Sequence, residues 1–284
     1  MTEHRYATRH WLWLAATLPA LLLAQGQDST PAERNLQIIA ALLPGIYDNA
    51  NQAYFDQRRK LPESERRPRT HLRISKTDSP YRFRYAVSEG GETHNGQLRL
   101  SLGEDPELVI MEHRPDAGEP PCQVAWRREA GQFAAAGDCE ESFQLYPGGL
   151  WFTRPGERPT QLLRAREFSC YVDIPGVAGG RDEPFERYSI ESLHDQGGLH
   201  WLRTKDGREI GITLRNVQWP INNEQGAFTR NSLVMYVLER DADGVRTHTY
   251  GWTEPQARRI GLNLQWLLVN CYLESNREIT PYFE

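Results

Sequence analysis

The sequence predicts a mainly β protein, an antiparallel barrel or sandwich with helices only near the two ends of the chain. Short segments in which apolar and polar residues alternate follow one another from about residue 71 to residue 252, as in Leu98, Leu100 and Leu102. Turn signals separate them, among them Asn95-Gly96 and the segment 241–244. We expect one antiparallel β-barrel domain over residues 27–284.

Two segments have helical periodicity. The first runs from Ala32 to Leu43, with apolar residues three and four positions apart, a capping Thr30 before Pro31, and an end at Pro44-Gly45. The second follows a capping Thr253 near the C-terminus. Its apolar face would hold Ile260, Leu264, Leu267, Leu268 and Cys271. We expect this amphipathic C-terminal helix to lie against the body of the protein.

The N-terminus has the order of a secretory signal. Arg5 and Arg9 precede an apolar run over residues 11–24, and a polar stretch follows. The run is shorter than the roughly 20 residues of a membrane span. We therefore expect residues 1–26 to be a signal peptide cleaved after Ala24 or Gly26, with no integral membrane span afterwards. The protein would be exported, periplasmic or secreted; an uncleaved anchor is the alternative.

Four cysteines suit an oxidising compartment, where an even number indicates disulfides. Spacing does not choose among the three possible pairings. Cys122 and Cys139 flank an expected hairpin and form the local pair; Cys170 with Cys271 would then tie the C-terminal helix to the body. Buried thiols are the alternative. No pair has the spacing of a zinc or redox site, so no metal is expected.

Charge and motifs exclude several function classes. The net charge of -5 comes without a long basic run, which argues against nucleic acid as a partner. Hydrolase, zinc-protease, phosphate-loop and dinucleotide signatures are missing, so the motifs indicate no cofactor. His194 and His200 are six residues apart, a spacing that does not indicate a metal pair. We expect them to be polar residues of a loop and a strand.

The stretch 80–87 is the most informative for binding. As a strand it places Tyr81, Phe83, Tyr85 and Val87 on one face, with the positions of Arg82 and Arg84 on the other. Arginines that face a barrel interior would make a site for an anionic ligand. Arginines on the outside would make this an ordinary wall strand with an aromatic inner face, and the pattern leaves both readings open.

Three patterns occur in a characteristic order. The first is a helix running into Gly45-Ile46-Tyr47-Asp48-Asn49-Ala50-Asn51-Gln52-Ala53; the second is Pro80-Tyr81-Arg82-Phe83-Arg84. The third is Cys122, a small hairpin and Cys139. Together they cover about residues 36–140, and with them the chain resembles the CpcT/CpeT family of phycobiliprotein chromophore lyases. The chain departs from the family between His71 and Pro80, where it is short.

The resemblance implies a lipocalin-like (calycin) barrel that binds an open-chain tetrapyrrole. Arg82 and Arg84 would pair with its propionates. Asp48, Asn49 or Gln52 would accept hydrogen bonds from pyrrole nitrogens, and Tyr47 and Tyr81 would stack on the rings. A family member with enzymatic activity would be a bilin lyase that orients the chromophore toward a cysteine of an acceptor protein. Catalytic residues are not assigned by the resemblance.

Function therefore has three readings. Bilin attachment is a cytosolic task, so an exported relative is expected to keep the barrel and to bind a tetrapyrrole-like or other hydrophobic small molecule without the acceptor. A true bilin lyase, and an envelope or assembly protein with a filled barrel, are the alternatives. For Asn49 and Gln52 the simpler role is hydrogen bonding at a turn and a strand edge.

Overall fold

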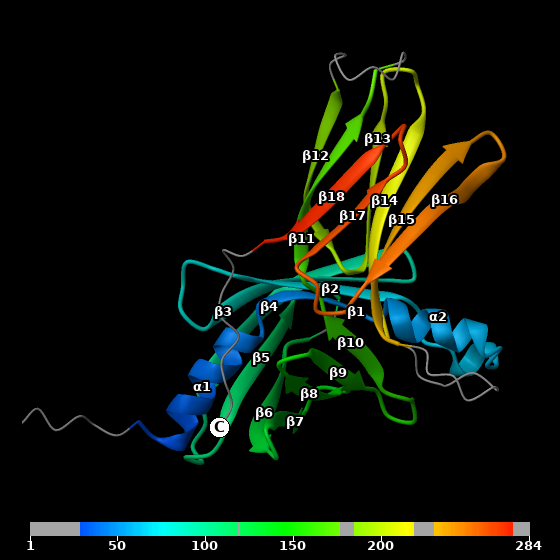
Figure 1. Ribbon diagram of the computed structural model, residues 1–284. Helices are drawn as coiled ribbons and strands as arrows, with labels where there is room; N and C mark the ends of the chain where they lie inside the picture. The colour runs from blue at the N-terminus through cyan, green and yellow to red at the C-terminus, as the bar shows by residue number, and fades with distance from the viewer. Residues whose placement is uncertain (1–28, 119, 177–184, 219–229, 275–284) are drawn as a thin grey trace, which may run out of the picture.

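The computed structural model describes residues 29–118, 120–176, 185–218 and 230–274 (Figure 1). The predicted signal segment 1–26 lies outside them. Within the described residues the protein is mainly β, as expected, with ten strands in a closed antiparallel barrel and eight more in two further sheets. Neither helix among these residues has the length and apolar character of a membrane-crossing segment.

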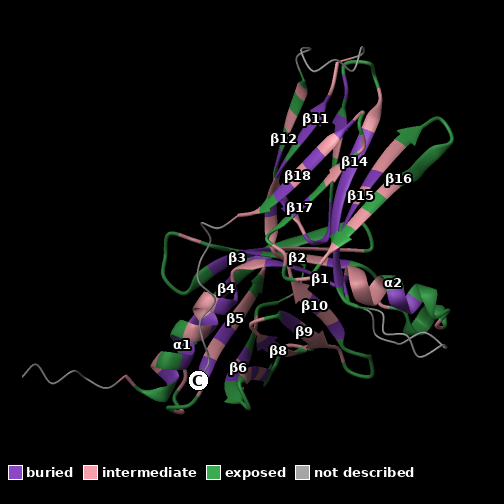
Figure 2. Ribbon diagram, viewed as in Figure 1, coloured by how far each residue is buried: buried purple, intermediate pink, exposed green. Residues whose placement is uncertain are grey.

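The barrel strands follow one another around the wall in chain order, and β1 closes it by pairing with both β2 and β10. Their inward-pointing side chains form one continuous hydrophobic core, and the buried residues lie along the strands in Figure 2. The strands are β1 (Gly45–Asp48), β2 (Thr70–Lys76), β3 (Arg82–Glu89), β4 (Glu92–Leu102), β5 (Val109–Pro115), β6 (Cys122–Glu129), β7 (Gln132–Gly137), β8 (Ser142–Tyr146), β9 (Gly149–Thr153) and β10 (Thr160–Arg164).

Helix α1 (Pro31–Leu42) confirms the first expected helix. Thr30 caps it, since its side chain accepts from the Glu33 amide and the Glu33 carboxylate accepts from the Thr30 amide. Its apolar face belongs to the barrel core, and the Ala32 amide donates to the Pro106 carbonyl in the β4–β5 turn. α1 therefore covers the end of the barrel at which that turn lies.

The segment that follows α1 holds one short strand and a second helix. β1 ends at Asp48 and helix α2 (Ala50–Arg58) begins two residues later. The turn forms because the Asp48 carboxylate accepts from the Ala50 amide at 2.7 Å, while Asn49 bonds to the backbone of Pro68 and Thr70. The charged loop after α2 includes one short 3₁₀ turn, η1 (Glu63–Glu65).

The last barrel strand ends at Arg164, and the described strands after it belong to other sheets, although one barrel domain was expected over residues 27–284. These strands form two four-stranded sheets that share a second hydrophobic core, above the barrel in Figure 1. We call this pair of sheets the sandwich. The first sheet has the order β12 (Glu186–His194), β11 (Glu167–Ile174), β18 (Leu268–Leu273), β17 (Arg259–Asn263). The second has the order β13 (Gln196–Arg203), β14 (Glu209–Val217), β15 (Ser232–Asp241), β16 (Gly244–Thr253).

The predicted C-terminal helix is wrong: β17 and β18 form an antiparallel hairpin there. Ile260, Val269 and Cys271 are buried in the second core, which they reach through strand alternation. The apolar residues of this segment fit a helical face and a pair of short alternating strands equally well. Pairing of β18 with β11, a hundred residues earlier in the chain, decided between them.

Both preferred disulfides are confirmed. Cys122–Cys139 joins the start of β6 to the end of the β6–β7 hairpin, and Cys170–Cys271 joins β11 to β18. The second bond therefore ties two paired strands of the sandwich, where a helix was expected.

Strand β3 places its aromatic residues inside the barrel. Phe83 and Tyr85 are buried in the core, whereas Arg82 and Arg84 are exposed on the outer surface. Of the two readings of this strand, the structure therefore has the wall strand with an aromatic inner face.

Candidate functional site

The barrel encloses a cavity of about 380 Å³. A ten-stranded barrel is wider than the eight-stranded kind whose interior side chains just fill, so space remains between its walls. Inward-facing apolar residues of seven strands make most of the lining, together with Leu43 after α1. The apolar lining residues are Leu43, Leu72, Ile74, Val87, Leu98, Met111, Pro115, Ala117, Trp126, Phe143, Leu150 and Phe152.

Charged groups lie at the end of the cavity opposite α1. Arg154, after β9, donates to Glu141 before β8 (3.2 Å) and to Glu89 at the end of β3 (3.4 Å). Partial burial lowers the pKa of Arg154, but the bonds and charges of the two carboxylates raise it more, so the pKa lies above its ordinary value. These ion pairs link three strands at the end of the barrel opposite α1, which we call the rim. They hold the Arg154 guanidinium beside the open end of the cavity.

A histidine and a tyrosine form a second polar unit on the cavity wall. His113 Nε2 lies 2.7 Å from the Tyr85 hydroxyl, and the two rings are 5.0 Å apart between centroids. The other ring nitrogen, Nδ1, lies 3.7 Å from Cys122 Sγ of the disulfide. These contacts orient both side chains, and both line the cavity.

Trp126 is the cavity residue with an unused donor. Its side chain is 1% exposed and lines the cavity, and its indole Nε1 has no hydrogen-bond partner among the described residues. An indole N–H can only donate, and a buried donor without an acceptor costs about 1–3 kcal/mol.

None of the seven residues that the sequence predicts to bind a ligand lines this cavity. Arg82 and Arg84 lie on the outer face of β3, and Tyr81 precedes that strand, 36% exposed, with a positive φ of 58°. The other four, Tyr47, Asp48, Asn49 and Gln52, lie together at the end of β1 and the start of α2. The structure does not bring the two groups to one site.

The four grouped residues make hydrogen bonds that join neighbouring segments of the chain. The Tyr47 hydroxyl, fully buried, donates to the Leu42 carbonyl at 2.6 Å; burial raises its pKa to about 12, although Arg164 opposes this. The Gln52 side chain donates to the Pro159 carbonyl and accepts from the Gln161 amide, which attaches α2 to β10. These contacts match the simpler role expected for Asn49 and Gln52.

The buried Asp48 is the centre of a polar cluster where the barrel meets the sandwich, and its partners are partly exposed. Arg69 donates to both of its carboxylate oxygens, at 3.2 and 3.0 Å, and His71 Nδ1 lies 3.0 Å from Oδ2. His194, at the end of β12, faces His71 with ring centroids 5.2 Å apart. Burial, and then the charges of His71, Arg69 and Arg73 against that of Asp48, lower the pKa of His194 to about 4.

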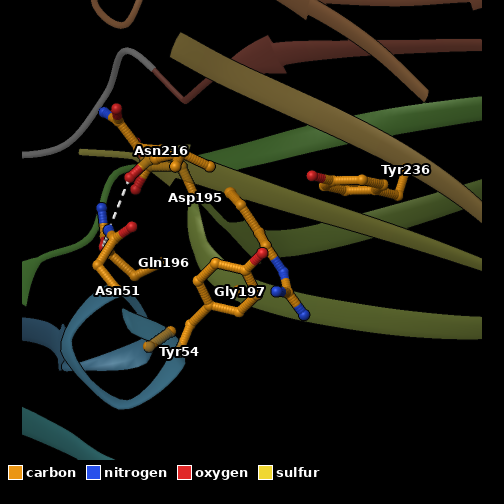
Figure 3. Close-up of a pocket in the computed structure, with 10 residues that line it drawn as sticks. Asn51, Tyr54, Asp195, Gln196, Gly197, Asn216 and Tyr236 are labelled. Carbon is orange, nitrogen blue, oxygen red and sulfur yellow. Dashed lines mark hydrogen bonds between the residues drawn. The ribbon is translucent and has the colours of Figure 1, made fainter. Parts of the chain in front are cut away.

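Beside this cluster, α2 and the sandwich border a hollow of about 60 Å³, enough for about two waters (Figure 3). Asn51 donates to the Asn216 carbonyl at 2.8 Å across it, and Gln196 lies within 3.4 Å of the same amide nitrogen. Tyr54 of α2 and Tyr236 of β15 complete the wall. The hollow is too small for an organic ligand, and its polar groups attach the sandwich to the barrel.

The cavity residues could have been found only in part from the sequence. Strand alternation indicates that Tyr85 and Val87 share an inward face, but which strands border the open end depends on barrel closure. No protein-family model, no curated protein and no solved structure matches this chain.

Proposed function

We propose that this is an exported binding protein of the CpcT/CpeT type, whose barrel holds a hydrophobic small molecule with hydrogen-bond acceptors, such as a tetrapyrrole. The observation that carries the proposal is the cavity of about 380 Å³ inside the closed barrel, within the usual range for small-molecule sites. Export is supported by two disulfides and by the signal-like N-terminus.

The lining favours a flat, largely apolar ligand with a polar end. Trp126, Phe143 and Phe152 supply ring surfaces along the wall, as conjugated rings require. The indole of Trp126, whose buried N–H has no hydrogen-bond partner among the described residues, is part of this wall. Arg154 at the rim can meet a carboxylate, a role that the exposed Arg82 and Arg84 cannot have for a ligand in this cavity.

The chemistry supports binding more than a covalent reaction. All four cysteines are paired in disulfides, so none of them offers a thiol to a ligand. A lyase function would require the acceptor thiol of another protein at the cavity mouth. Transfer of a bound bilin to an acceptor cysteine would make the protein a lyase, and binding without transfer would leave it a carrier.

A cavity-filling variant tests the proposal. Val87 lines the cavity from β3, and its neighbour Ala86 lies on the outer face of the same strand. Titration with biliverdin and with haem, followed by absorbance, should give saturable binding to the wild type. Val87→Trp should weaken binding at least 10-fold because the new ring fills the cavity, while Ala86→Trp, the matched control, should bind as the wild type does.

Two outcomes would decide against a cavity ligand. If neither pigment nor the general apolar probe anilinonaphthalene sulfonate binds, the envelope or assembly reading is favoured. If a ligand binds equally to Val87→Trp, its site is outside the barrel. Replacing both Arg82 and Arg84 with alanine should leave the affinity unchanged, because both are on the outer surface.

A further inference from the structure

The cluster of Asp48, His71 and His194 has no part in the proposed cavity function. The three residues come from β1, β2 and the end of β12, so the first two belong to the barrel and the third to the sandwich. One potential metal-ligand atom of each lies within 4.8 Å of those of the other two. The sequence does not indicate this cluster, because 23 positions separate Asp48 from His71 and 123 separate His71 from His194.

One buried side-chain atom of the cluster has no hydrogen-bond partner among the described residues. The Asp48 carboxylate accepts from the Ala50 amide and from Arg69, and His71 Nδ1 lies against it. His194 Nδ1 is buried and has no partner among the residues that the structure describes. A buried ring nitrogen without a partner is costly unless something else binds it.

We propose that the cluster binds one divalent transition-metal ion, with Zn²⁺ as the reference ion, through ring nitrogens of His71 and His194 and the Asp48 carboxylate. Two imidazoles and a carboxylate are a common zinc ligand set, and a fourth position would be left for water. Ligand atoms around one zinc ion lie at most about 4 Å apart, twice the Zn–N distance. The ligand atoms lie within 4.8 Å of one another, so gathering them around one ion needs side-chain shifts of no more than about 1 Å.

Arg69 has two opposite effects on such a site. Its bonds to Asp48 hold the carboxylate in place, as outer-shell groups do in metal sites, but its charge opposes a cation. The positive charge of Arg73, which also acts on His194, adds to that repulsion. We therefore expect micromolar affinity rather than the tight binding of a structural zinc finger. An ion here would link barrel to sandwich and raise the unfolding temperature by mass action.

The test is titration of the full chain, without a histidine tag and stripped with EDTA, with ZnCl₂ in a calorimeter. The wild type should bind one ion, and the His194→Ala variant should bind at least 10-fold more weakly. His200→Ala is the matched control, since His200 is exposed on the neighbouring strand β13, and it should bind like the wild type.

A second measurement does not depend on how the variants fold. Cobalt(II) added to the wild type should give the visible absorption of a nitrogen- and oxygen-ligated four- or five-coordinate site, and zinc should displace it. No stoichiometric binding by the wild type, or equal binding by a folded His194→Ala or His194→Gln variant, would overturn the proposal. So would loss of binding in His200→Ala with His194→Ala unaffected.

Discussion

The His194 imidazole should make stability depend on pH between about 4 and 6.5. Its pKa is lowered to about 4, whereas an unfolded histidine titrates near 6.5. Between these values the unfolded chain binds a proton that the folded chain does not, so the free energy of unfolding falls as the pH falls through this window. The contribution of the neutral His194 imidazole to the free energy of unfolding is complete above pH 6.5 and is lost by about pH 4.

The size follows from the two pKa values. A difference of about 2.5 units corresponds to at most about 3.4 kcal/mol, and between pH 7.5 and 4.5 most of it, about 2–3 kcal/mol, should be lost. Urea unfolding at the two pH values, with EDTA present, measures the loss. Carboxylates titrate in this range too, so the measured quantity is the difference between the wild type and a His194→Gln variant, whose amide does not titrate.

The wild type should lose about 2–3 kcal/mol more than His194→Gln between the two pH values. The reasoning would be refuted by equal losses in the two proteins, since His194 would then titrate near its ordinary pKa when folded. A larger loss in the variant would contradict even the sign of the effect.

The remaining predictions concern the two cores and their disulfides. Loop-closure entropy gives a cost of about 4.7 kcal/mol for removing Cys170–Cys271, which spans 101 residues, against about 3 kcal/mol for Cys122–Cys139, which spans 17. Thermal unfolding of the two double-serine variants should rank them in that order; a reversed ranking would mean that native contacts outweigh loop length. Phe133→Ala, at a fully buried barrel position, should lower the free energy of unfolding by about 3–5 kcal/mol in urea, and a loss under 1 kcal/mol would contradict the packing described.

Local signals in the sequence predicted the local structure. The Thr30–Glu33 capping pair and the spacing of apolar residues indicated α1, and alternation indicated the barrel strands. Hairpin proximity pointed to the Cys122–Cys139 bond, and the remaining pair followed. Each of these depends on residues close together in the chain, where periodicity and turn chemistry decide the conformation.

Features that depend on distant partners were not predictable in the same way. Closure of the barrel at β10 requires β1 to pair across more than a hundred residues. The β17–β18 segment has the periodicity of a helix and forms a hairpin instead, because β11 pairs with β18. The outward direction of Arg82 and Arg84 was left open by a pattern that fits either face. The cluster of Asp48, His71 and His194 likewise forms only when the barrel packs against the sandwich.

The central claim, a ligand inside the barrel, is tested most directly at the indole N–H of Trp126, which lines the cavity without a partner among the described residues. Its signal in an NMR spectrum of the ¹⁵N-labelled protein can be assigned by its loss in Trp126→Phe. Saturation with biliverdin should shift this signal and leave unchanged that of Trp252, which is 65% exposed on β16 of the sandwich. A shift of Trp252 with Trp126 unmoved would place the ligand outside the barrel and contradict the account.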